Sequence, residues 1–304
     1  MIAFVLSNKE AVSQLLPKDT MVDLAIRILP VGILGARIYY VLFSWDSFAD
    51  NVLSVFYIWE GGLAIYGGLI AGFLTVLFFC RRRKLHLFMM LDLIVPGVAL
   101  AQSIGRWGNY FNQEAFGFPL NATSSLCFFP IAVLIQEPSG YVWHLATFFF
   151  ESMLDLLISI FLFWGRRNLF RRRGDVFLFY VFLYSSGRLV IENMRMDSLY
   201  LGSTIRISQL FSIAAVIFIL FYLFRRRFQT GCHLSSFLYI SVTGCMIYSG
   251  LILFYCFTGS FIWNTTILEQ ILILSFYSVL IILNVFFLYG KSRISEVYYA
   301  KHKC

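Results

Sequence analysis

Long uninterrupted apolar segments are the feature of this sequence that most restricts its fold. Several are about 20 residues long, the length that a helix needs to cross the roughly 30 Å hydrocarbon layer of a bilayer. Of the 304 residues, 60% are apolar and 13% are charged, whereas soluble domains have about 45–50% and about 25%. One compact core cannot bury this excess. The sequence therefore predicts an all-α, polytopic membrane helical bundle and excludes a soluble enzyme, a disordered tail and a disulfide-stapled secreted domain.

The apolar segments also predict the number of spans and two regions of the chain. We expect seven complete spans and an eighth C-terminal span, over residues 21–44, 57–80, 85–103, 142–165, 175–190, 206–224, 234–258 and 267–289. The apolar residues 1–6 are too few to cross a bilayer and are expected to be the end of a truncated N-terminal span. The predicted regions are a membrane domain at 1–227 and a C-terminal extension with two spans and a basic tail at 228–304.

Basic residues predict the orientation of the chain. Most of the 24 lysines and arginines fall in short clusters between spans, and these clusters lie on one side when the spans alternate. By the positive-inside rule that side is the cytoplasm, so the basic loops and the C-terminus are expected inside the cell. A net charge of +8 with this distribution indicates contact with anionic lipid and not with nucleic acid.

Six arginines fall outside these clusters: Arg27, Arg37, Arg106, Arg188, Arg195 and Arg206. All except Arg27 map to the outer half of the membrane or to its outer edge. A charge within a span is costly and is mostly functional, and guanidinium groups suit two-point recognition of phosphate or carboxylate. The alternative is that each arginine extends its charged end to the interface. Five arginines together favour an anion site, with an outer-leaflet phospholipid as the anion.

Metal and cofactor signals are weak in this sequence. The six cysteines are scattered, without a CxxC pair or a histidine spacing typical of zinc. We therefore expect no structural metal, no disulfide framework and no cofactor.

A dense polar motif follows the third predicted span. Residues 105–117 read GRWGNYFNQEAFG and bring glycines, amides, a guanidinium and a carboxylate to an outer membrane edge. Glycine lets the backbone approach a ligand closely, and the polar side chains supply donors and acceptors for a polar head group. The motif resembles the signature of the bacterial prolipoprotein diacylglyceryl transferase family, approximately GRxGNxxNxExxG. The matching residues are Gly105, Arg106, Gly108, Asn109, Asn112, Glu114 and Gly117.

Other segments resemble the same family, in the same order, along residues 1–227. Residues 35–43 resemble its GARxxYV segment, and residues 59–68 resemble its WxGGxxxH/YGG segment, where Tyr66 replaces the histidine of many members. Asp92 and Pro96 match a DxxxP stretch. A YxxGRxxxExxR helix end is matched by Tyr184, Gly187, Arg188, Glu192 and Arg195.

The spacing of the charged residues in this helix end has a physical meaning of its own. Tyr184, Arg188, Glu192 and Arg195 follow one another at intervals of 4, 4 and 3 residues, so they share one helix face. Glu192 is therefore expected to hold a neighbouring guanidinium in position for a ligand. The alternative is an ordinary charge-paired helix end.

The resemblance implies a reaction and the residues that perform it. Family members transfer a diacylglyceryl group from phosphatidylglycerol to the thiol of a lipobox cysteine in a preprolipoprotein. This reaction forms a thioether, releases glycerol phosphate and begins lipoprotein maturation in the bacterial cytoplasmic membrane. Catalytic roles are implied for Arg106, Arg188 and Tyr66, with the active site toward the outer leaflet. Substrate binding is implied for Arg37, Asn109, Asn112, Glu114, Gly117, Tyr184, Glu192 and Arg195.

Independently of the resemblance, the residues support one part of this reaction, the departure of the phosphate ester. The leaving group is a phosphate ester, and guanidinium groups can stabilise its developing charge. The nucleophile belongs to the substrate, which agrees with the lack of a visible Ser-His-Asp or Cys-His set. Its thiol must still lose a proton, because the thiolate is the reactive species.

Two departures from the family keep other functions open. The family segment HPxxLYE reads LATFFFE at 145–151, where only Glu151 and the aromatic character match, and residues 228–304 match no family segment. One alternative is a transporter or flippase for an anionic lipid or metabolite, although the inverted repeats typical of transporters are not evident. The other is a non-catalytic paralogue that only binds lipid or substrate.

Overall fold

The computed structural model describes residues 2–14, 16–17, 19–49, 51–138, 140–170, 172–196, 200–201, 205–229, 244, 275, 277–286 and 289. Apart from residue 244, the predicted span at 234–258 lies outside the described residues, as does most of the C-terminal extension. The described chain is mostly helical and divides into two compact units. The first unit takes its residues from 1–98 and 165–177, and the second takes its residues from 99–164 and from 178 onward.

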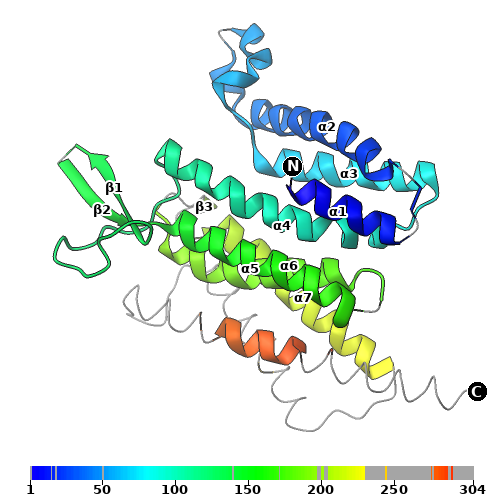
Figure 1. Ribbon diagram of the computed structural model, residues 1–304. Helices are drawn as coiled ribbons and strands as arrows, with labels where there is room; N and C mark the ends of the chain where they lie inside the picture. The colour runs from blue at the N-terminus through cyan, green and yellow to red at the C-terminus, as the bar shows by residue number, and fades with distance from the viewer. Residues whose placement is uncertain are drawn as a thin grey trace, which may run out of the picture. The chain divides into compact units, whose positions relative to one another are not determined.

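Two long helices, α2 (Thr20–Phe43) and α3 (Ile65–Arg83), pack side by side in the first unit (Figure 1). The unit also contains α1 (Ile2–Ser13) and the beginning of α4 (Leu87–Asn112). Three short 3₁₀ turns, at 45–47, 52–56 and 58–60, connect α2 to α3. Leu24, Phe79, Met90 and Leu93 are buried together in the core of this unit. Apolar packing between the helices thus holds the unit together.

The contact between α2 and α3 depends on two facing glycines. A Cβ atom on Gly67 of α3 would collide with the carbonyl oxygen of Gly35 on α2 and with Cβ of Tyr39. A Cβ atom on Gly35 would in turn meet the carbonyl oxygen of Gly67, 2.8 Å away. Small residues allow helix backbones to approach this closely in membranes.

Replacing Gly67 with alanine is expected to destabilise the α2–α3 pair by about 1–3 kcal/mol, the usual cost of overpacking. The added methyl group meets backbone atoms, which cannot move aside as a flexible side chain would. Gly72→Ala on the same helix is the matched control, because its Cβ would lie 3.8 Å from Ile28 in an ordinary contact. Thermal unfolding in detergent should show a lower Tm for Gly67→Ala alone. Equal Tm values for the two variants would contradict the assigned contact.

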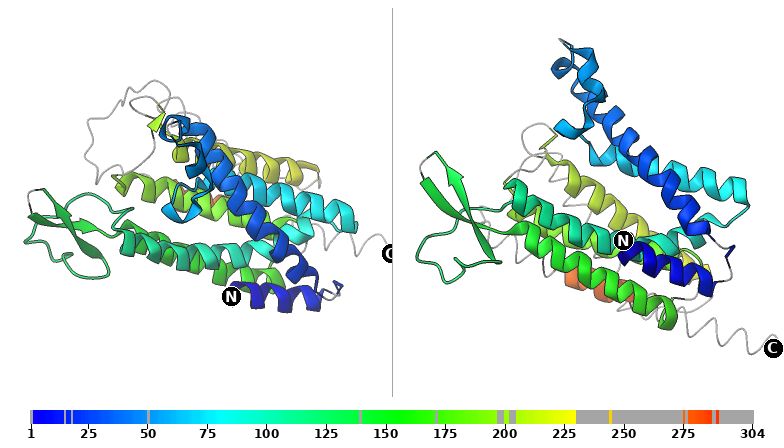
Figure 2. Two further views of the ribbon diagram at one scale, coloured as in Figure 1. Left: turned by 90° about the horizontal axis from the view of Figure 1, so that it is seen from above. Right: turned by 45° about the horizontal axis from the view of Figure 1, so that its top comes forward.

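The second unit is a helical bundle with a β-hairpin at one end. It contains the end of α4, most of α5 (Thr147–Asn168) and of α6 (Asp175–Ile191), and α7 (Ile207–Gln229). Its strands are β1 (Ala132–Glu137), β2 (Gly140–Leu145), β3 (Tyr200–Leu201) and β4 (Ile205–Arg206). Figures 1 and 2 show the β1–β2 hairpin beyond the ends of α4 and α5. The buried core of the bundle includes Phe148, Leu162, Phe182, Leu189 and Leu220.

The β-hairpin is joined firmly to the helix that follows it. β1 and β2 pair antiparallel, with Ala132 opposite Leu145 and Glu137 opposite Gly140. Val133 and Ile135 are buried against Phe148, near the start of α5. The hairpin therefore packs directly on the helix that carries Glu151.

Four helices of the described chain are long and apolar enough to cross a membrane: Ile65–Arg83, Leu87–Asn112, Thr147–Asn168 and Ile207–Arg226. Helices α2 and α6 also coincide closely with the predicted segments 21–44 and 175–190. The prediction of a polytopic helical membrane protein is thereby confirmed at this level. The full number of spans, and the division at residue 227, stay predictions.

The fold is mostly helical, as predicted, but the residues before α5 form a β1–β2 hairpin that the prediction of an all-α fold did not include. The predicted span at 142–165 begins within β2, and its helix begins only at Thr147. Tyr141, Val142 and Trp143 favour strands, and a short apolar run does not distinguish a strand from a helix. Apolarity alone therefore placed this boundary incorrectly.

Two other boundaries also differ from the prediction. The segment 57–80 becomes helical only at Ile65, because Gly61 and Gly62 adopt φ values of 93° and 68°, outside the helical region. The helix predicted at 85–103 continues to Asn112. The polar motif at 105–112 ended the apolar run but not the helix, so Arg106 and Asn109 project from a regular helix and not from a loop.

A short helix from the C-terminal extension packs in the second unit. Residues 277–286 are helical, and Ile281 and Val285 are buried. Ser278 donates a hydrogen bond to the carbonyl oxygen of Ser186 on α6, 3.1 Å away. The ring of Phe286 lies edge-on to Phe179 with centroids 5.5 Å apart. This part of the extension is therefore integrated with the bundle.

Candidate active site

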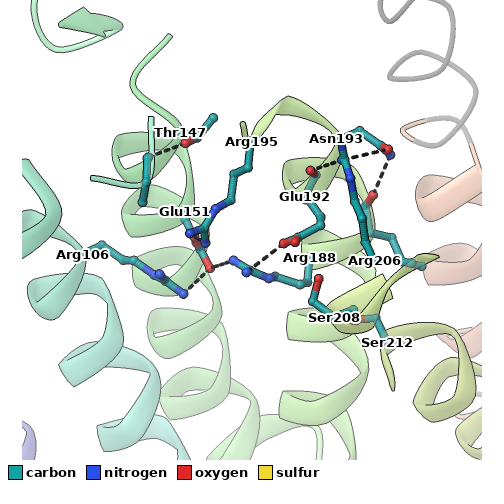
Figure 3. Close-up of polar contacts among 12 residues, drawn as sticks. Arg106, Thr147, Glu151, Arg188, Glu192, Asn193, Arg195, Arg206, Ser208 and Ser212 are labelled. Atoms are coloured by element: carbon teal, nitrogen blue, oxygen red, sulfur yellow. Dashed lines mark hydrogen bonds and ion pairs between the residues drawn. The ribbon is translucent and has the colours of Figure 1, made fainter. Parts of the chain in front are cut away.

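Three arginines converge on one buried carboxylate in the second unit. The Oε1 atom of Glu151 accepts hydrogen bonds from Nη2 of Arg106 and from Nη1 of Arg188, the latter at 2.6 Å. Nη1 of Arg195 lies 3.9 Å from the other oxygen, Oε2. Figure 3 shows the three guanidinium groups approaching Glu151 from different segments of the chain. The side chain of Glu151 is only 2% exposed, so this charge is almost removed from solvent.

Hydrogen bonds between α4 and α5 set the position of Arg106 relative to Glu151. Trp107, next to Arg106, donates from its indole nitrogen to the hydroxyl of Ser152, next to Glu151, at 3.1 Å. That hydroxyl donates to the carbonyl oxygen of Ser103 at 2.8 Å. The residues that flank the ion pair thus fix the register of the two helices. A guanidinium group held in this way is already oriented before any substrate binds.

A second carboxylate holds Arg188 from its other side. Glu192 lies one turn after Arg188, and its Oε2 atom is 2.8 Å from Nη2 of that arginine. Arg206, the last residue of β4 and the residue directly before α7, donates to the carbonyl oxygen of Glu192 and to the side chain of Asn193. The ion pair that sequence spacing predicted between Arg188 and Glu192 is present. Arg206 adds a link to α7 that the spacing within one helix could not predict.

Carboxylates hold the guanidinium groups of this cluster before any ligand binds. Arg106, Arg188 and Arg195 lie against Glu151 and Glu192, and Asp155 interacts electrostatically with Arg106 and Arg188. Charges removed from water are costly unless they are paired and hydrogen-bonded. Each guanidinium group has five N–H donors, so Arg106 and Arg188 can contact an anionic ligand while they remain bound to Glu151.

Polar residues of the GRWGN motif lie at the end of α4, near this cluster in sequence. The side-chain amides of Asn109 and Asn112 donate to Oε1 of Glu114 at 3.4 and 2.8 Å. All three side chains are partly or fully accessible, in contrast to the buried ion pairs. They therefore form an accessible polar group one helical turn beyond Arg106.

Gly117 and Thr147 connect the segment after α4 to the start of α5. A Cβ atom on Gly117 would lie 2.7 Å from the carbonyl oxygen of Met194 and 2.9 Å from Thr147, so no larger residue fits. Thr147 donates from its hydroxyl to the carbonyl oxygen of Ala115 at 2.5 Å. Gly117 also forms an isolated β-bridge with Arg195. The predicted binding residue Gly117 thus contacts the cluster through its backbone.

Tyr184 belongs to the same group of residues. It lies one turn before Arg188 on α6 and stacks on Tyr180, with ring centroids 6.0 Å apart. Its hydroxyl interacts electrostatically with Glu151, Arg188 and Arg106. The structure therefore brings Tyr184 together with the arginines, as the sequence predicted.

Arg37 and Tyr66 lie in the first unit, and the arginine cluster lies in the second. The guanidinium of Arg37 donates to the carbonyl oxygens of Ser54, Val55 and Gly61 at 2.6, 2.8 and 2.7 Å. These bonds hold the chain between α2 and α3 in shape. Tyr66 lies in the first turn of α3, with its ring centroid 6.4 Å from that of Tyr39. The sequence predicted that Arg37 binds substrate. The structure shows that Arg37 also stabilises the segment between α2 and α3.

Sequence reasoning did not assign the central residue of this cluster. Glu151 was matched to the family but given no role, and Arg206 was counted only as an outer arginine. A signal was available, because Glu151 and Asp155 are carboxylates one turn apart within an apolar span. Such residues are rare in spans and usually functional. In the structure Asp155 is fully buried and interacts electrostatically with Arg106 and Arg188.

Comparison with known proteins identifies the family. A model of the prolipoprotein diacylglyceryl transferase family matches residues 1–225. The chain belongs to the prolipoprotein diacylglyceryl transferase family. The matched residues include all members of the arginine cluster, so the family prediction from the sequence is confirmed.

Individual relatives of this family agree over most of their length. The phosphatidylglycerol–prolipoprotein diacylglyceryl transferase of Halalkalibacterium halodurans is 38% identical over 218 residues, 71% of this chain and 75% of that protein. The enzyme of the same name from Streptococcus equi subsp. equi is 40% identical over 232 residues, 76% of this chain and 88% of that protein. That of Streptococcus suis is 42% identical over 225 residues, 73% and 82% of the two chains.

Proposed function

We propose that this protein transfers a diacylglyceryl group from phosphatidylglycerol to the lipobox cysteine of a prolipoprotein and releases glycerol phosphate. The observation that carries the proposal is the convergence of Arg106, Arg188 and Arg195 on Glu151 within a diacylglyceryl transferase domain. The guanidinium groups of the cluster can bind a phosphate. The protein is a helical membrane protein, so phospholipids of the surrounding bilayer can reach it.

The phosphate is proposed to bind Arg106 and Arg188. Both guanidinium groups contact the same oxygen of Glu151, so they lie side by side with their remaining donors available. Planar guanidinium groups bind two oxygens of a phosphate at once. Glu151 and Glu192 hold the arginines in place, so little reorganisation is needed as charge develops.

In the proposed reaction, the thiolate sulfur attacks the glyceryl carbon that carries the phosphate ester. A carbon–sulfur bond forms, the carbon–oxygen bond breaks, and its electron pair moves to the phosphate oxygen of the leaving group. Arg106 and Arg188 stabilise the charge that develops on that oxygen. Positive charge near the thiol also favours its ionised form. The substrate supplies the nucleophile, so the protein supplies positioning and charge.

The accessible polar residues are proposed to orient the substrates. Asn109, Asn112 and Glu114 form a hydrogen-bonded group beyond Arg106 that can contact the glycerol head group and the peptide. Positive-inside charge supports an orientation with the basic loops and the C-terminus in the cytoplasm. The active site is then toward the outer leaflet of the bacterial membrane. Residues 1–227 are proposed as the transferase domain, with 228–304 as its extension.

Mass spectrometry of a lipobox peptide tests the proposed activity directly. The purified protein in phosphatidylglycerol nanodiscs should add one diacylglyceryl group to the cysteine of the peptide. A peptide with serine in place of cysteine, and nanodiscs of phosphatidylcholine alone, should show no addition. An active transporter would instead move labelled phosphatidylglycerol between leaflets and leave the peptide unmodified, and a non-catalytic paralogue would do neither. Either result would overturn the proposal.

Tyr66 is proposed to donate a hydrogen bond to a substrate and not to remove the thiol proton. A tyrosine side chain has an ordinary pKa near 10, which keeps it neutral at pH 7. We expect Tyr66→Phe to reduce transfer by about 0.5–1.5 kcal/mol, the value of one hydrogen bond, and Tyr66→His to remain active. Steady-state rates of peptide modification measure both effects. A loss of several orders of magnitude in Tyr66→Phe, with phosphatidylglycerol binding intact, would show that Tyr66 takes the proton.

A further inference from the structure

Strand β2 is paired on both of its edges. On one edge it pairs with β1, and on the other it contacts the segment 117–120. Leu145 accepts a hydrogen bond from the N–H of Gly117, and Trp143 accepts one from the N–H of Leu120, both at 2.7 Å. The backbone groups of Trp143 and Leu145 therefore point away from β1.

Strand β1, in contrast, has an outer edge that the described part of the chain leaves open at Leu134. Backbone groups of opposed residues in an antiparallel pair point either toward or away from the partner strand together. Ala132 and Leu134 are opposite Leu145 and Trp143, so their N–H and C=O groups point away from β2. The N–H of Ala132 donates to the carbonyl of Phe128, which confirms this direction. Among the residues that the structure describes, none forms a backbone hydrogen bond with Leu134 at this edge.

A cavity of about 250 Å³ borders β1. Val133, Leu134 and Ile135 line it, and successive strand residues point to opposite faces. The cavity therefore follows the edge of the strand and not only one face. Its other walls come from the end of α4, the segment that follows it and the start of α5, including Asn109, Tyr110, Glu114, Phe116 and Phe148.

The cavity and the arginine cluster use neighbouring turns of the same two helices. Asn109 and Tyr110 follow Arg106 on α4 by three and four residues, and Phe148 precedes Glu151 on α5 by three residues. These intervals correspond to one turn of α-helix, about 5.4 Å along the axis. A molecule bound in the cavity is therefore about one helical turn from Arg106 along α4 and from Glu151 along α5.

The chemistry of the cavity does not match the lipid substrate. Its lining is aromatic and aliphatic, with amide groups and the carboxylate of Glu114, and the lining residues include no arginine or lysine. The phosphate of the lipid therefore finds no positive charge in this lining, although the amides can still contact the glycerol part of the head group. The volume is also below the range of about 300–1,000 Å³ that is usual for pockets that enclose whole small ligands. It suits one or two side chains of a larger partner.

We propose that the β1 edge and this cavity bind the prolipoprotein as an added strand. The extended segment beside the substrate cysteine pairs with the free N–H and C=O groups of Leu134, and one of its apolar side chains enters the cavity. Unpaired strand edges bind extended peptides in this way. The thiol is then delivered one helical turn away, at the arginines. This inference rests on the proposed function, which makes a peptide the second substrate.

A proline at position 134 tests the strand pairing. Leu134→Pro removes the outward N–H, while the hydrogen bonds of β1 to β2 come from the alternate residues. We expect KM for the lipobox peptide to rise roughly 3- to 10-fold, the effect of one backbone hydrogen bond, with KM for phosphatidylglycerol unchanged. Leu134→Ala, which keeps the N–H, should change the peptide KM by less than Leu134→Pro. An unchanged peptide KM in Leu134→Pro, or a rise confined to the KM for phosphatidylglycerol, would overturn the proposal.

Photo-crosslinking to the wild-type protein gives a measurement that does not depend on a variant folding. A lipobox peptide with benzoylphenylalanine two residues before its cysteine should attach within 133–135 or at Phe111, and excess unlabelled peptide should suppress attachment. Attachment in the first unit, with transfer intact, would overturn the docking site alone. Attachment at β1 without any transfer by the wild-type protein would overturn the proposed function and leave the docking site standing.

Discussion

Replacing Arg106 or Arg188 with lysine is expected to remove most transferase activity although the positive charge remains. Lysine presents a compact ammonium group and cannot bind Glu151 and two phosphate oxygens at once, as a planar guanidinium does. Loss of one well-placed donor to a transition state typically costs about 2.7–4 kcal/mol, or a factor of about 10²–10³ in rate. Initial rates of peptide modification at equal amounts of folded protein measure this effect.

Arg27→Lys is the matched control for these two variants. Arg27 lies on α2 with its side chain 53% exposed and pairs with Asp23 one turn away, outside the arginine cluster. This variant should retain wild-type turnover. Near wild-type turnover in Arg106→Lys or Arg188→Lys would remove that arginine from the proposed catalytic set.

The second large effect is expected from Glu151→Gln. The substitution removes the charge that Arg106 and Arg188 share, and it turns an amide N–H₂ toward at least one guanidinium group. Breaking a buried ion pair by neutralising one partner costs about 3–5 kcal/mol, because the other charge stays buried without compensation. We expect a clearly lower Tm in detergent and a severe loss of transfer.

Glu137→Gln provides the comparison for this variant. Glu137 contacts His144 in the hairpin, and its side chain is 38% exposed, so its neutralisation should change the Tm little. A wild-type Tm together with wild-type transfer in Glu151→Gln would contradict the positioning role assigned to Glu151.

The sequence predicted the helices of this protein better than it predicted their ends. Apolar length located α2, α4, α6 and α7, since crossing a bilayer demands a long apolar helix. The same criterion stopped α4 at residue 103, although the helix continues to Asn112. Polar residues end an apolar run, but a helix continues where those residues find partners in the fold. The boundary of α5 failed because Val142 and Trp143 fit a strand as well as a span.

For the candidate site, sequence spacing could place only residues of the same helix. The pairing of Arg188 with Glu192 followed from their interval of four residues. The pairing of Arg106 with Glu151 crosses between helices at a separation of 45 residues, which no local periodicity indicates. The role of Arg37 was also beyond reach, because its partners are backbone carbonyls of a distant turn. Composition shows which charges a span contains, and only the fold shows which of them meet.

The carboxylate of Glu151 has a consequence for the end of the catalytic cycle. A permanent counter-ion inside the site lowers the attraction of the arginines for any free anion. Phosphatidylglycerol overcomes this because its acyl chains hold it in the membrane at high local concentration. The detached glycerol phosphate has no such tether and must rely on the weakened attraction alone. In the proposed reaction, the residue that holds the arginines in place therefore also promotes release of the product and turnover.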